Sequence, residues 1–181
     1  CLLSRGLGDV YKRQALEFSS SFPDMVSKLC LMNASHSMPV HPDLIKMAET
    51  NDKKVIDLML KWCYAGHSGD IMTEHGQIMT NKKSIDVAKM ILSSKKLSDV
   101  LAKDLKACNN YSNGKDSAKK INCPTMILSG DKDKMISIDK AKELHQNIVG
   151  SRLEVVHEAG HMLSSEEVVQ VRKVLSDFFR I

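Results

Sequence analysis

The chain has 181 residues, of which 43% are hydrophobic and 27% are charged, and its formal net charge is +4 at pH 7. This composition is typical of a globular protein and excludes an intrinsically disordered chain. The charge is spread along the sequence without a basic stripe, so we expect no nucleic-acid partner. No apolar run approaches the roughly 20 residues that span a bilayer, so we expect no stable membrane insertion.

Cysteine and histidine spacings do not predict a metal or cofactor site. The five cysteines lie far apart and form no CxxC pair, which is typical of reduced thiols in a cytoplasmic protein. Four histidines lack the HxxxH or HxH spacing of a metal site and are interpreted as surface residues; they are His36, His41, His67 and His75. We therefore expect no metal and no cofactor.

The first fourteen residues differ in character from the rest of the chain. Residues 1–14, CLLSRGLGDVYKRQ, resemble translated sequencing-adapter sequence and are interpreted as a non-native or disordered tail. The alternative is an ordinary disordered N-terminus. Residues 15–21 have the pattern of the last turns of a helix, which ends at Phe22 because the following Pro23 disfavours helical geometry in the preceding residue.

Three short apolar segments predict strands. Residues 28–33 (KLCLMN) form an apolar run bounded by polar residues, and residues 124–130 end in a glycine turn. The third strand is expected over residues 152–158. Helical patterns follow the second and third strands, over residues 139–148 and 164–179. Strands that alternate with helices predict a parallel sheet covered by helices.

The amphipathic pattern of the last helix suggests how it begins. Ser164 or Ser165 can cap residues 164–179, and Glu166 and Glu167 then lie near the positive end of the helix dipole.

Residues 38–114 alternate helical patterns with polar breaks and contain no strand-like run. Pro42 begins one helix, residues 55–62 have helical spacing, and Ser84 begins a further helix. Residues 97–108 continue the helical character, and residues 111–116 (YSNGKD) are typical of a turn or linker. This insertion is large enough to form a helical cap over the sheet.

Several segments together resemble the α/β-hydrolase superfamily in their order and spacing. They are residues 15–18 (ALEF), 22–29 (FPDMVSKL), 123–133 (CPTMILSGDKD), 159–162 (AGHM) and 168–179. The resemblance implies an α/β fold: the C-terminal part of a parallel α/β-hydrolase sheet with an inserted helical cap. Residues 15–37 and 115–181 would form the partial core, and residues 38–114 the cap.

His161 and Asp133 are the candidate catalytic residues. His161 follows the third strand, and imidazole titrates near neutrality, as a general base requires. The adjacent Gly160 is expected to permit an unusual backbone angle. Asp133 follows the preceding strand, so parallel pairing would bring both residues to one sheet edge. The resemblance places the acid three residues after Gly130, which favours Asp133 over its competitor, Asp131.

The nucleophile of the family is missing. A G-x-S-x-G elbow should precede Ala15, but the sequence near Asp9 does not form one, even for relatives with an aspartate nucleophile. The segment 66–70 (GHSGD) has a serine, Ser68, but lacks the final glycine and follows a helical pattern. The serines of residues 33–37 (NASHS) follow a strand without a glycine-flanked elbow and are expected to line the pocket.

The resemblance implies a serine-type hydrolase that cleaves ester or related acyl bonds through a nucleophile–His–Asp triad, and a chain that is inactive without its nucleophile. Two alternatives remain: a non-catalytic binding protein of this fold, and an epoxide or haloalkane hydrolase with an aspartate nucleophile. The expected partner is a small molecule, an apolar acyl or ester compound. We interpret most of the cap's methionines and aromatic residues as core and expect one or two to reach the pocket; they are Met38, Met47, Met59, Met72, Met79, Met90, Trp62 and Tyr64.

Overall fold

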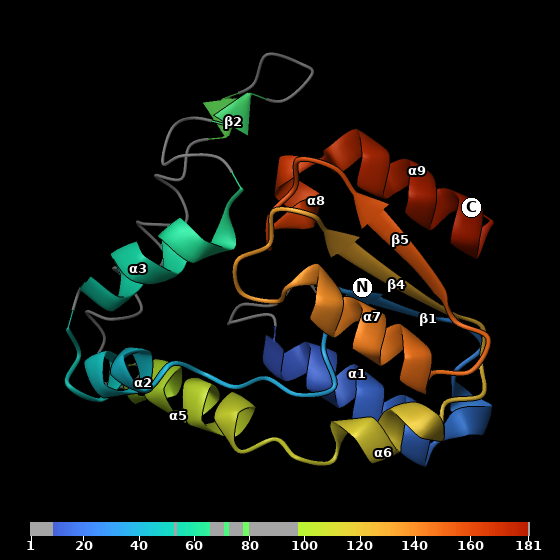
Figure 1. Cartoon of the computed structure of the whole chain (residues 1–181), viewed down its shortest axis with the longest axis horizontal. Helices are drawn as coiled ribbons and strands as arrows, with labels where there is room; N and C mark the ends of the chain where they lie inside the picture. Colours follow the sequence, from blue (N-terminus) through green and yellow to red (C-terminus); the bar gives the residue numbers. More distant parts are fainter. Residues whose placement is uncertain (1–8, 53, 66–70, 73–77, 80–97, 181) are drawn as a thin grey trace.

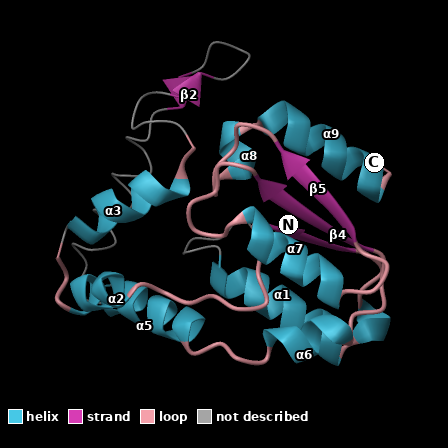
Figure 2. Ribbon diagram, viewed as in Figure 1, coloured by secondary structure: helices cyan, strands magenta, loops and turns pink. Residues whose placement is uncertain are grey.

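The computed structural model describes residues 9–52, 54–65, 71–72, 78–79 and 98–180. A parallel sheet with the strand order β1-β4-β5 lies between helices (Figures 1 and 2). Its strands are β1 (Leu29–Met32), β4 (Thr125–Gly130) and β5 (Arg152–Val156). The three strands that the apolar runs predict are therefore present. They form a three-stranded parallel sheet in which β4 is the central strand and β1 and β5 lie on either side of it.

Alternate residues of each strand pack against different helices. Leu31 and Ile127 lie opposite each other in the register and pack on one face with α1 (Asp9–Ser21), α6 (Gly114–Lys119) and α7 (Ile138–Asn147). Leu128 and Val156 pack on the other face with α8 (Leu163–Glu166) and α9 (Val168–Phe179). Both faces of the sheet are covered, which explains why all six residues of β4 are buried and why its sequence does not alternate.

Helix α1 begins earlier than the sequence suggests. Residues 1–14 are predicted to be a non-native or disordered tail; residues 9–14, the part of it that the structure describes, form the first turns of this helix. Leu16 is 2% exposed and belongs to the sheet's core, so packing holds the helix in place. A short 3₁₀ helix, η1 (Pro23–Met25), follows α1, and Pro23 occupies its first turn, where the missing N–H group of proline costs no hydrogen bond.

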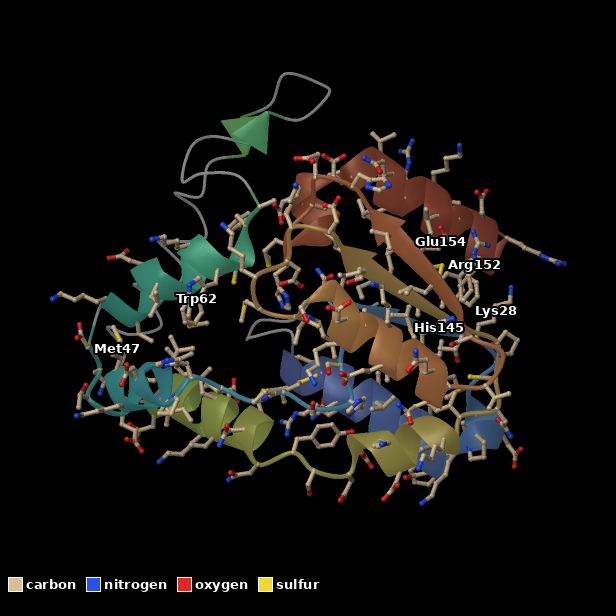
Figure 3. The ribbon with its side chains drawn as sticks, in the orientation of Figure 1. Lys28, Met47, Trp62, His145, Arg152 and Glu154 are labelled. Atoms are coloured by element: carbon tan, nitrogen blue, oxygen red, sulfur yellow. The ribbon has the colours of Figure 1, made fainter. Side chains whose placement is uncertain are left out.

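A second group of helices has its own small core. It contains α2 (Pro42–Glu49), α3 (Lys54–Cys63) and α5 (Ser98–Asn109), which lie to one side of the sheet in Figure 1. Leu44, Val55 and Leu105 are buried between these helices, and Met47 and Trp62, labelled in Figure 3, pack against them. These helices fall within the stretch predicted as a cap.

The prediction that this stretch contains no strand is wrong. Strands β2 (Ile71–Met72) and β3 (Ile78–Met79) form a two-stranded antiparallel sheet. Each has two residues, which is too short to show a periodic pattern in the sequence. The helix expected from Ser84 lies outside the described residues.

Two further boundaries differ from expectation. The linker predicted over residues 111–116 is partly helical, because α6 begins at Gly114, where a Cβ would stand 2.0 Å from His36 O. The final helix is divided into α8 and α9 by Glu167, whose φ of −127° and ψ of 58° are not helical. Glu167 is therefore the N-cap residue of α9, and the expected capping by Ser164 or Ser165 is wrong. Within the part of the chain that the structure describes, every helix is too short or too polar to span a bilayer.

Candidate active site

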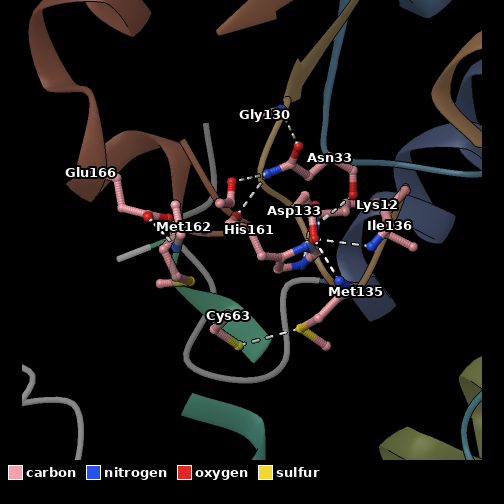
Figure 4. A network of polar contacts seen from close by, with 12 residues as sticks. Lys12, Asn33, Cys63, Gly130, Asp133, Met135, Ile136, His161, Met162 and Glu166 are labelled. Carbon is pink, nitrogen blue, oxygen red and sulfur yellow. Dashed lines mark hydrogen bonds and ion pairs between the residues drawn. The ribbon is translucent and has the colours of Figure 1, made fainter. Parts of the chain in front are cut away.

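The carboxyl ends of two neighbouring strands bring Asp133 and His161 together. Asp133 lies on the loop after β4 and His161 on the loop after β5, and the two strands pair in parallel as far as Gly130 and Val156. Asp133 Oδ2 lies 2.8 Å from His161 Nδ1 (Figure 4). The side chains are 0% and 6% exposed, respectively. This is the juxtaposition expected from the strand order, while the catalytic roles of the two residues remain predictions.

The backbone of its own loop holds the Asp133 carboxylate. Asp133 Oδ1 accepts hydrogen bonds from Met135 N at 2.7 Å and from Ile136 N at 3.0 Å. Both oxygens therefore have partners, as a buried carboxylate requires. The two backbone bonds fix the direction of the carboxylate and leave Oδ2 facing the imidazole.

Lys12, on α1, faces the other imidazole nitrogen. Its Nζ lies 2.9 Å from His161 Nε2 and donates to Asn33 O at 2.9 Å. A lysine ammonium has only donors, so we assign Nε2 as an acceptor and the ring proton to Nδ1, facing Asp133. This tautomer is the one that a general base needs, because the lone pair on Nε2 is then the group that can accept a proton.

Asn33, at the end of β1, joins the loops that carry the pair. Asn33 is fully buried, with 0% of its surface exposed. Asn33 Nδ2 donates to Gly160 O at 3.0 Å and to His161 O at 2.9 Å, and Asn33 Oδ1 accepts from Gly130 N at 2.9 Å (Figure 4). The sequence analysis treated Asn33 as the boundary of a strand and missed this role. A polar residue directly after a buried strand was the available signal.

The histidine loop also packs against the end of α3. A Cβ on Gly160 would stand 2.4 Å from Ala65 N, so the glycine is required by close approach. The expectation that Gly160 has an unusual backbone angle is wrong, because the positive φ in this loop, 58°, belongs to Glu158. Glu166 accepts a hydrogen bond from Ala65 N at 2.7 Å. Burial raises the pKa of Glu166, although backbone N–H groups partly oppose the shift.

The competing acid has a different environment. Asp131 Oδ2 lies 3.1 Å from His157 Nδ1, and the side chains of Asp131 and His157 are 28% and 80% exposed. The structure thus contains a buried Asp–His pair and an exposed one on adjacent loops. Since an exposed pair is screened by water, the geometry favours Asp133 as the partner of a functional histidine.

The other candidates do not join this pair in the described structure. Ser68 lies outside the described residues, as do His67 and His75. Ser35 is buried, and its Oγ accepts a hydrogen bond from Ser37 N at 3.2 Å. His41 caps α2 and His36 lies 3.2 Å from Glu143. The described part of the chain contains no cluster of three or more His, Cys, Asp or Glu side chains arranged to hold a metal ion.

A cavity of about 180 Å³ lies between the helices and the acid loop. Its walls are mainly apolar and come from α2 and the segment before it, from α3 and α5, and from the residues after Asp133. They include Met38, Leu44, Trp62, Leu105, Met135 and Ile136. Met135 and Ile136 also hold Asp133 through their backbone N–H groups. The cavity therefore borders the loop that carries the acid.

No protein-family model and no curated protein matches the sequence. Solved structures do match the fold. A thermophilic esterase superposes with a TM-score of 0.75 at 23% identity, over 93% of this chain and 62% of that chain. An esterase from Exiguobacterium antarcticum has a TM-score of 0.77 at 20% identity, over 97% of this chain and 65% of that chain.

An enol-lactonase from Burkholderia xenovorans LB400 has a TM-score of 0.74 at 17% identity, over 96% of this chain and 64% of that chain. The chain thus spans less than two thirds of the length of each of these proteins. The parallel order β1-β4-β5, the helices on both faces and these superpositions agree. The chain has a partial α/β-hydrolase fold.

Proposed function

We propose that Asp133 and His161 are the acid and the base of a hydrolase triad that cleaves ester or related acyl bonds. The observation that carries this proposal is the buried 2.8 Å contact between Asp133 Oδ2 and His161 Nδ1. A carboxylate in this position holds imidazole in the working tautomer and stabilises the imidazolium that forms when it accepts a proton. The names of the similar structures, two esterases and a lactonase, support the same reaction class.

The proposed reaction proceeds through an acyl-enzyme. A nucleophile hydroxyl loses its proton to His161 Nε2 and attacks the ester carbonyl, and the imidazolium then returns the proton to the departing alcohol. Water repeats the two steps and releases the acid. Backbone N–H groups near the nucleophile stabilise the oxyanion in each step.

The chain of 181 residues is proposed to lack this activity by itself. Within the described residues, the Lys12 ammonium lies 2.9 Å from His161 Nε2, and an ammonium group has no lone pair with which to attack a carbonyl carbon. The test is hydrolysis of a chromogenic ester by the purified chain, with and without a phosphonate that labels serine nucleophiles. We expect no phosphonate-sensitive turnover. Turnover that disappears with a label on Ser68 would overturn this proposal.

The source DNA upstream of the codon for Ala15 distinguishes the three candidate functions. A G-x-S-x-G sequence after an apolar strand supports the serine hydrolase, and an aspartate in the serine position supports an epoxide or haloalkane hydrolase. Absence of both supports a non-catalytic binding protein. Where that DNA encodes a longer protein, expression of this protein with and without His161→Ala tests for turnover that depends on His161.

The proposed substrates are small apolar acyl or ester compounds. The apolar walls of the cavity beside the acid loop support this class, since ligand pockets use apolar surface for affinity and few polar groups for orientation. A series of nitrophenyl esters with the longer reading frame tests it. Medium chain lengths should react faster than charged esters, and equal or faster turnover of the charged esters contradicts the proposal.

A further inference from the structure

We propose that Asn33 is a positioning residue that holds the acid loop and the histidine loop in register, so that Asp133 and His161 remain in contact. This inference rests on the proposed function for the meaning of the pair. The contact itself is a structural property of this chain, and it is measurable without any hydrolysis.

The side chain of Asn33 connects three strand ends. Asn33 directly follows β1. Its side chain accepts a hydrogen bond from Gly130 N at the end of β4, and it donates to Gly160 O and His161 O after β5. Figure 4 shows this amide between Gly130 and the backbone of His161. One planar group thus sets the distance between the start of the acid loop and the backbone of the histidine.

The backbone of Asn33 is also fully engaged. Asn33 N donates to Leu128 O at 2.8 Å, and Asn33 O accepts from Lys12 Nζ at 2.9 Å. Asn33 has a φ of 45°, in the left-handed region that asparagine tolerates better than most residues. This backbone conformation directs the side-chain amide toward the ends of β4 and β5, so the three side-chain hydrogen bonds of Asn33 depend on it.

The pattern of donors and acceptors requires an amide. Two carbonyl oxygens need donors and one N–H needs an acceptor, and the asparagine side chain supplies two N–H donors and one oxygen. An aspartate has the same shape, but its ionised form would direct oxygen at Gly160 O and His161 O. An alanine would leave all three groups without this partner inside the protein.

A second link joins the same two loops and defines what Asn33 adds. Lys132 N donates to Ala159 O at 2.9 Å, which ties the acid loop directly to the histidine loop. That bond does not involve β1. Asn33 anchors both loops to the sheet, so its loss should allow the loops to shift against each other while the strands stay paired.

The experiment compares the full chain with its Asn33→Ala and Asn33→Asp variants by NMR. The readout is solvent exchange of the His161 Nδ1 proton, which is protected by its bond to Asp133, against exchange of the backbone amides of β4. We expect the Nδ1 proton to exchange about tenfold faster in both variants, in excess of any change in the β4 amides. The matched control is Asn147→Asp, which removes an amide donor to Glu143 O on α7 and should leave the His161 proton unchanged.

The outcomes separate positioning from folding. Unchanged exchange of the His161 proton in Asn33→Asp overturns the proposal, and so does an equal acceleration of the β4 amides, which would indicate general loosening. Loss of cooperative melting in both variants would make Asn33 a folding residue and also overturn it. Because none of these measurements uses a substrate, failure of the proposed hydrolysis cannot be mistaken for failure of this proposal.

Discussion

Glu166 Oε2 accepts a hydrogen bond from Ala65 N at 2.7 Å, and this bond joins α8 to the segment that follows α3. Glu166 Oε1 accepts from Met162 N at 3.1 Å. The Met162 N–H group also faces Cys63 O at 3.1 Å. One half-buried carboxylate therefore connects the helical group around α3 with the loop that carries His161.

Replacing Glu166 by alanine should destabilise the chain by about 1–2 kcal/mol, because Ala65 N and Met162 N lose a charged acceptor. For a domain of this size that corresponds to a fall of several degrees in Tm. Glu167→Ala is the matched control, since the Glu167 side chain accepts from the exposed Gln170. Thermal melts of the two variants check the prediction, and an equal effect at both positions would contradict it.

Glu166 should also make stability depend on pH. Burial raises its pKa above the ordinary value of 4.5, and the nearby Asp133 carboxylate acts in the same direction. The folded state therefore holds this proton more tightly than the unfolded chain. The stabilisation is fully present below the unfolded pKa and is lost as the pH rises through the folded pKa. Urea unfolding at several pH values measures the free energy of unfolding of the chain and of its Glu166→Gln variant. The value for the chain minus the value for the variant should decrease from pH 4.5 upward. A difference that does not change with pH would refute this.

In any longer form of the protein that hydrolyses esters, Asp133→Asn should abolish most of this activity. The amide would present N–H to His161 Nδ1 and favour the tautomer with its proton on Nε2. The expected loss in kcat is about 10⁴-fold, the size of this effect in a serine-protease triad. Asp131→Asn, in the exposed pair with His157, should retain kcat within about threefold. Steady-state kinetics decide, and equal losses in the two variants would remove the distinction between the pairs.

Gly130→Ala should disrupt the contact between β4 and the histidine loop. The added Cβ would stand 2.2 Å from Ala159 O and 2.7 Å from Gly160 O, so backbone must move, at a cost of about 2–4 kcal/mol. Gly150→Ala is the control: its Cβ would meet nothing within 4 Å, and its φ of 74° costs about 1 kcal/mol. Urea unfolding measures both. A larger effect at Gly150 would show that strain, and not close approach, dominates.

Trp62 should report ligands in the cavity beside the acid loop. It lines this cavity and is the single tryptophan of the chain, so an apolar acyl analogue should change the fluorescence of the protein saturably. Met135→Ala removes part of the apolar wall of the cavity and should weaken binding of the apolar analogue by about tenfold. Met25→Ala changes a residue that is 72% exposed and should not affect binding. A charged analogue that binds as tightly as the apolar one would contradict the proposed substrate class.

The order of strands and helices around the sheet could be predicted from the sequence, because burial on both faces leaves unbroken apolar runs such as the one in β4. The same reasoning placed Asp133 and His161 at one sheet edge, since parallel strands end together. Local geometry was less accessible. The helical start of α6 lies at Gly114, which closely approaches the distant backbone of His36, and no local pattern records that approach.

The sequence by itself determined the class of fold and the two loops on which an acid and a base lie. Tertiary structure alone decided the surroundings of these two residues. Asn33 bonds to the histidine loop, Lys12 lies beside His161 Nε2, and Glu166 accepts a hydrogen bond from Ala65 N. The physical reason is the range of the interactions. Apolar periodicity arises from neighbours a few residues apart, whereas the contact between Asn33 and Gly160 joins residues separated by 127 positions and exists only after the chain has folded.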